Sequence, residues 1–197
     1  MYVPLQYQVS EYDCVPITFI NAITYLFDRR SIPPLVIQRI NIYSLDTVSR
    51  GGKLGRGGTS PYAIRLIGNW LNSYKTKTFS VSTEYLLEDQ IHLQEGSPII
   101  PCLKEGGVAL CNIYLGHREW HYILALKVEE DWMYFFDPYW RQTLRGLRGI
   151  VKILKSEDGR APNLAIRLDW LDSHREQQRF CFGETPDREC LLMWRQR

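Results

Sequence analysis

The sequence contains no long apolar run and no recognisable export signal. No stretch approaches the roughly 20 apolar residues that a membrane-spanning helix needs. The first six residues, Met-Tyr-Val-Pro-Leu-Gln, carry no basic region leading into an apolar core and a cleavage site. We therefore expect a cytoplasmic protein without a membrane span.

The chain also lacks a large excess of charge of either sign. Its 24 basic and 22 acidic residues give a net charge of +2, and the two signs are interspersed. Such a chain has no strong positive field to attract the phosphate backbone of a nucleic acid. We therefore expect no nucleic-acid partner.

Paired cysteine motifs and clustered histidines are absent. An odd number of cysteines without a CxxC pair fits reduced thiols better than a disulfide framework. The four histidines are scattered, so the sequence does not indicate a zinc site. We expect no metal and no cofactor. Cys102 and Cys111 lie in apolar runs and are interpreted as buried core thiols, whereas the pattern does not assign Cys181 or Cys190.

A chain of 197 residues fits one domain. Apolar residues at three- and four-residue steps predict a helix from near Cys14 to before Arg30. Further helices are predicted over Pro34–Tyr43 and from Pro61 to about Leu71, each with a proline in its first turn. Residues 78–82 alternate like a strand, and residues 84–93 read as a short helix.

From about residue 96 the character changes to β-branched and aromatic runs separated by turn residues. The predicted strands are Ile99–Leu103, Val108–Leu115, Tyr122–Val128, Trp132–Phe136 and Ile150–Leu154. We therefore predict a single α+β domain in two lobes, with N-terminal helices packed against a C-terminal antiparallel sheet. The helical lobe covers about 1–95, the β lobe about 96–170, and a C-terminal extension about 171–197.

Cys14 is the candidate nucleophile, because it stands where the first helix begins. Backbone N–H groups and the positive end of the helix dipole favour a thiolate over a thiol at this position. Gln8, six residues upstream, can donate its side-chain amide to the oxyanion that forms when the thiolate attacks a carbonyl. Asp13 is the expected N-cap of the helix.

Two residues of the second half complete the parts of a thiol acyl-transfer site. His121 begins a predicted strand and Asp137 ends the next one, so antiparallel pairing brings them together. Asp137 then fixes the imidazole tautomer and leaves the other ring nitrogen for the sulfur. His117, four residues earlier, is the rival base.

These residues resemble a known family. The run from Gln8 to Cys14, the strand opening with His121 and the Asp137-Pro138 pair are similar to papain-like cysteine peptidases of the bacteriocin-processing type. That family cuts leader peptides, often as the N-terminal domain of a peptide-exporting ABC transporter. The resemblance spans roughly residues 6–140 and implies a papain-like two-lobe fold.

The resemblance also implies the role of each site residue. Gln8 would line the oxyanion hole and Cys14 would be the nucleophile. His121 would be the general base and Asp137 would orient it. One departure is that Val15-Pro16 follows the cysteine, where a glycine is common in that family.

The expected activity is hydrolysis of a peptide or isopeptide amide bond through a Cys-His-Asp triad and a thioester acyl-enzyme. Two alternatives stay open, namely an acyltransferase that moves an acyl group from a thioester to an amine, and a non-catalytic peptide-binding module. The expected partner is a peptide or protein substrate, such as a leader peptide or an acyl-thioester carrier. Gly51–Gly58 is interpreted as a mobile loop that gates the cleft.

Overall fold

The computed structural model describes residues 2–155, 159–174 and 178–196. These residues form one antiparallel sheet of seven strands in the order β1-β7-β2-β3-β4-β6-β5. The strands are β1 (Val81–Leu87), β2 (Val108–Gly116), β3 (Glu119–Glu129), β4 (Trp132–Phe136), β5 (Val151–Ile153), β6 (Leu164–Arg167) and β7 (Glu189–Arg195). The α-helices are α1 (Cys14–Leu26), α2 (Pro34–Tyr43), α3 (Pro61–Ser73), α4 (Ile99–Lys104) and α5 (Leu168–Leu171). The α+β class that the sequence predicted is confirmed.

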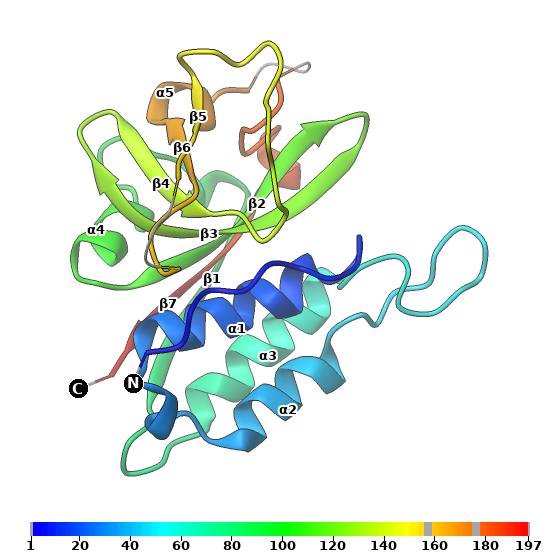
Figure 1. The fold of residues 1–197 in the computed structure, drawn as a ribbon, viewed down its shortest axis with the longest axis vertical. Coiled ribbons are helices and arrows are strands. Elements are labelled where there is room, and N and C mark those ends of the chain that lie inside the picture. The colour runs from blue at the N-terminus through cyan, green and yellow to red at the C-terminus, as the bar shows by residue number, and fades with distance from the viewer. Residues whose placement is uncertain (1, 156–158, 175–177, 197) are drawn as a thin grey trace.

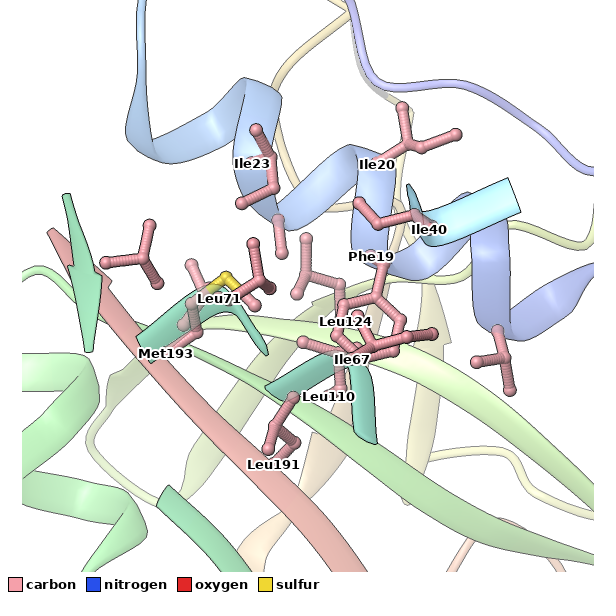
Figure 2. Close-up of a cluster of buried hydrophobic side chains, with 14 of the residues drawn as sticks. Phe19, Ile20, Ile23, Ile40, Ile67, Leu71, Leu110, Leu124, Leu191 and Met193 are labelled. Carbon is pink, nitrogen blue, oxygen red and sulfur yellow. The ribbon is translucent and has the colours of Figure 1, made fainter. Parts of the chain in front are cut away.

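The long helices α1, α2 and α3 cover one face of the sheet, and the shorter α4 and α5 lie on the other side (Figure 1). A hydrophobic core fills each side. Figure 2 shows the helical side, where Phe19 of α1, Ile40 of α2 and Ile67 of α3 gather over Leu124 of β3. All four side chains are fully buried. Burying this much apolar surface is the main force that fixes α1 against the sheet.

The three long helices begin and end close to where their sequence patterns predict. Pro61 stands at the start of α3, and the preceding Ser60 caps that helix by accepting a hydrogen bond from the backbone N–H of Ala63. Pro34 stands at the start of α2, where its missing N–H costs nothing. The predictions of these helices are confirmed.

Two shorter predictions were wrong. Residues 84–93 do not form the predicted α-helix, because β1 runs to Leu87 and pairs with β7 along its whole length, and Glu88–Gln90 form only a single 3₁₀ turn. Residues 99–103 form helix α4 instead of a strand. Its buried residues Ile99, Cys102 and Leu103 share one helical face, and Pro101 has no N–H to donate to a strand ladder.

Strand β7 lies in the part of the chain that we expected to be a C-terminal extension, about 171–197. It is inserted between β1 and β2, so the end of the chain joins two strands that are neighbours in sequence order. Its side chains from Glu189 to Met193 are buried on both faces of the sheet, which is why its sequence shows a continuous apolar run without alternation. Residues 175–177 and 197 of that predicted extension lie outside the described residues.

The N-terminal segment runs along α1 as an extended chain (Figure 1). The buried side-chain amide of Asn21, on α1, bonds both the N–H and the C=O of Gln6, at 2.7 and 2.9 Å. The N–H of Leu5 donates to the carbonyl of Gly159 at 2.7 Å. These bonds fix the course of the chain as it approaches Gln8. Among the described residues, the helices are too short and too polar for any of them to cross a bilayer.

Candidate active site

His121 and Asp137 are brought together by the pairing of β3 with β4. His121 is the third residue of β3, and Asp137 follows directly after the last residue of β4. The Nε2 atom of His121 lies 2.7 Å from Oδ1 of Asp137, and both side chains are buried. The second half of the sheet therefore presents an imidazole already joined to a carboxylate.

Both members of this pair have shifted pKa values. Burial alone would lower the pKa of His121, but the negative charge and hydrogen bond of Asp137, with a smaller contribution from Cys14, raise it from 6.5 to about 9. Burial alone would raise the pKa of Asp137, but His121 and then Arg141 hold it below its ordinary value. The pair is therefore an imidazolium bonded to a carboxylate at neutral pH.

Cys14 is the first residue of α1, and its side chain is half-buried. It lies close enough to His121 to add to the rise in the pKa of that ring, after the larger effect of Asp137. Because Nε2 of His121 is bonded to Asp137, Nδ1 is the ring nitrogen that remains for the sulfur. The structure thus places the three residues in the order Cys14, His121, Asp137 along one chain of contacts.

Gln8 lies beside this chain of contacts and is held there by its backbone. Its N–H donates to the carbonyl of Pro138 at 2.8 Å, immediately after Asp137. Its side-chain Nε2 donates to the carbonyl of Ser10 at 2.8 Å, while Oε1 is buried and has no hydrogen-bond partner within the described residues. One N–H of the amide is therefore used inside its own loop and the second is left for another acceptor.

Asp13 does not cap α1 as we expected. It occupies the N-cap position, but its side chain makes no capping hydrogen bond. Its carboxylate instead accepts from the N–H of Val9 at 3.1 Å and from the N–H and hydroxyl of Ser10 at 3.0 Å. Asp13 thereby closes the loop between Gln8 and Cys14, and leaves the first N–H groups of α1 without a competing carboxylate.

A cavity of about 500 Å³ lies against Gln8 and His121. Its remaining lining residues are Glu11, Tyr12, Leu115, Glu119, Trp120, Tyr139 and Arg141. It is large enough for a few residues of a peptide. The loop Gly51–Gly58, which we interpreted as a gate, contributes none of the residues that line this cavity, so the structure gives no support to that role.

Two residues that support Asp137 were not predicted from the sequence. Arg141 donates from Nε to Oδ2 of Asp137 at 2.5 Å. Asn163 accepts from the N–H of Asp137 at 2.7 Å and donates to its C=O at 2.8 Å. The only sequence signal was that Arg141 stands four residues after Asp137. This spacing indicates an ion pair only inside a helix, whereas this segment is a loop.

The remaining histidines stand apart from the site. His117 is exposed in the turn between β2 and β3, with a φ of 53°, so the rival base is not the partner of Asp137. His174 is exposed beside Arg188. The other four cysteines are buried, with Cys102 on α4, and burial raises its pKa to about 11.

Comparisons with protein-family models and with curated proteins find no match for this chain. Within the described residues, no three His, Cys, Asp or Glu side chains gather closely enough to hold a metal ion. A function is therefore argued from the geometry of Cys14, His121 and Asp137 and from the chemistry that such a group supports.

Proposed function

We propose that the protein is a thiol-dependent hydrolase that cleaves a peptide or isopeptide amide bond, with Cys14 as nucleophile. The observation that carries the proposal is that His121 is bonded to Asp137 through Nε2 while Cys14 also raises the pKa of its ring. A histidine whose only role was to bond a buried carboxylate would not also need a thiol from the start of a helix close to its ring. This arrangement meets the geometric requirements of an activated thiol.

The reaction begins when the Cys14 thiolate attacks the carbonyl carbon and the carbonyl π electrons move onto oxygen. The resulting oxyanion is bonded by the Cys14 backbone N–H and by the free amide N–H of Gln8. His121 gives its proton to the leaving nitrogen as the C–N bond breaks, which leaves a thioester. Water then attacks the thioester, its proton passes to His121, and the acid product and the thiolate are released.

The arrangement of the elements supports a papain-like two-lobe reading. Helix α1 supplies the sulfur, and the sheet supplies the imidazole and the carboxylate from β3 and the end of β4. The cavity that meets Gln8 and His121 is lined from both parts of the chain. Cys14 is not among its lining residues, so in the proposal this cavity holds the peptide on one side of the scissile bond, and the whole chain acts as one peptidase domain.

The test is intact-mass labelling at neutral pH with a panel of peptide vinyl sulfones and acyl-thioester mimics. We expect stoichiometric labelling of Cys14 in the wild type, none in Cys14→Ala, and a rate at least tenfold lower in His121→Ala. His117→Ala is the matched control and should behave as the wild type, because His117 lies outside the site.

Two other results would replace the proposal. Labelling of Cys14 no faster than that of a free thiol would indicate a peptide-binding module without catalysis. A thioester adduct that forms amide product with an added amine faster than it hydrolyses would indicate an acyltransferase on the same site.

A further inference from the structure

The guanidinium of Arg141 is bonded to the carboxylate that orients the proposed catalytic histidine. Its Nε lies 2.5 Å from Oδ2 of Asp137, and only 17% of the Arg141 side chain is exposed. An ion pair this well shielded from water is weakened little by salt, unlike the exposed pair of Lys127 and Glu129. The contact is therefore part of the built site and not a chance surface pair.

The two oxygens of Asp137 have different partners. Oδ1 is shared by Nε2 of His121 at 2.7 Å and by the N–H of Tyr139 at 2.8 Å. Oδ2 is bonded by Arg141. Because Asp137 is almost fully buried, loss of Arg141 would leave one carboxylate oxygen without a partner in a low-dielectric site, which is costly for the ionised form.

Two aromatic rings fix the orientation of the guanidinium. The Cζ atom of Arg141 lies 4.9 Å from the ring centroid of Tyr139 and 5.0 Å from that of Phe180. Phe180 is buried. A planar cation held between two rings can keep one N–H aimed at Oδ2, which a flexible ammonium group would not do equally well.

We propose that Arg141 is a positioning residue that keeps the Asp137 carboxylate ionised and directed at His121, so that the imidazolium remains paired with a carboxylate beside Cys14 as the pH falls. This role rests on the proposed function. It makes the site a row of three alternating charges, guanidinium, carboxylate and imidazolium, that ends at the sulfur of Cys14. Arg141 acts through Asp137, and nothing in the proposed reaction requires it to touch the scissile bond.

Other titratable groups surround this row from several elements. They are Tyr7 of the N-terminal segment, Tyr139 of the same loop, Lys155 beyond β5, and Glu11 and Glu119 at the cleft. Both glutamates are exposed to water. Among the described side chains, Arg141 and the protonated His121 are the two cations within hydrogen-bond distance of Asp137.

The test measures the rate of Cys14 alkylation by iodoacetamide against pH in the wild type, Arg141→Gln and Arg141→Lys. Loss of a cation this close to a carboxylate typically raises its pKa by about one unit or more. Because the alkylation rate reports Cys14, which feels this change through His121, we expect the acidic limb of the Arg141→Gln profile to move to higher pH by up to about one unit. The acidic limb of Arg141→Lys should lie between those of Arg141→Gln and the wild type, since lysine keeps the charge without the planar N–H geometry.

Arg148→Gln is the matched control, because Arg148 is an exposed arginine of the same segment, and its profile should match the wild type. A purely structural role for Arg141 would lower the melting temperature without moving the limb. If the acidic limb of the Arg141→Gln profile lies at the same pH as that of the wild type, the positioning role is overturned. If Arg141→Gln does not fold, an Arg141→Lys profile identical to the wild type would overturn it.

Adding His121→Ala to the same pH profiles separates this role from the proposed function. If the pH profile of His121→Ala is the same as that of the wild type, Cys14 does not depend on His121. Both inferences would then fail together. A wild-type profile that depends on His121 but not on Arg141 would leave the proposed hydrolase standing and remove only the role of Arg141.

Discussion

The Nε2 atom of His121 bonds Oδ1 of Asp137 across 2.7 Å, although 16 positions of the chain separate the two residues. The bond exists because β3 and β4 are antiparallel neighbours. It occupies one ring nitrogen and leaves the other for Cys14 at the start of α1. A thiol, an imidazole and a carboxylate therefore meet where the helical layer joins the sheet.

Cys14 should be the one fast-reacting thiol of the native protein. Cys102, Cys181 and Cys190 are buried. Burial raises the pKa of Cys102 and Cys181, whereas the pKa of Cys190 is raised first by its hydrogen bond with Cys111 and then by burial. Brief treatment with iodoacetamide should modify Cys14 alone, as measured by peptide mapping. Modification of a buried cysteine at a comparable rate would contradict this expectation.

Gln8→Ala should lower kcat by about 100- to 1000-fold on any substrate that the labelling panel identifies, because one oxyanion donor is lost. The alkylation rate of Cys14 should stay within about twofold of the wild type, since alkylation forms no oxyanion. Equal losses in both measurements would instead mean that Gln8 serves to hold the loop in which it bonds Ser10.

The stability of the protein should depend on His121 in a defined pH window. Its folded pKa of about 9 lies above the ordinary value of 6.5, so its contribution is complete below pH 6.5 and is lost as the pH rises through about 9. The wild type should lose on the order of 3 kcal/mol of unfolding free energy between these limits, relative to His121→Ala. Urea unfolding at pH 6 and pH 10 measures the difference, and parallel pH curves for both proteins would contradict it.

Asn163→Ala should impair the site as well as the fold. It removes both bonds to the backbone of Asp137 and should lower the unfolding free energy by about 1–3 kcal/mol. The labelling rate of Cys14 should fall with it, because Asp137 loses its position. Asn72→Ala is the matched control, since Asn72 makes the same two bonds to the backbone of Thr83 on β1, and it should lower stability without slowing labelling.

Much of the fold follows from local patterns that sequence alone reveals. The boundaries of α2 and β4 were predicted to the residue, because Pro34 starts the helix and turn residues flank the strand. Pairing partners were harder to predict. Strand β1 was misread as helix beyond residue 83, since its extended form depends on β7, more than 100 residues later.

The site divides in a similar way. Gln8, Cys14, His121 and Asp137 could be chosen because their residue types and order match one chemistry. Asn163 could not, because an asparagine near no motif acquires its role only when the chain folds back onto Asp137. The carboxylate of Asp13 was assigned to its helix, whereas it bonds the loop on its other side. Local propensity did not decide between these two partners.

The proposed chemistry requires that His121 is protonated at neutral pH and lies beside Cys14. NMR titration of the His121 ring nitrogens in the wild type and in Cys14→Ser tests it most directly. His121 should stay protonated at neutral pH in the wild type and titrate near its raised pKa of about 9. In Cys14→Ser the midpoint of the His121 titration should be lower. A His121 midpoint near 6.5 in both proteins would contradict it.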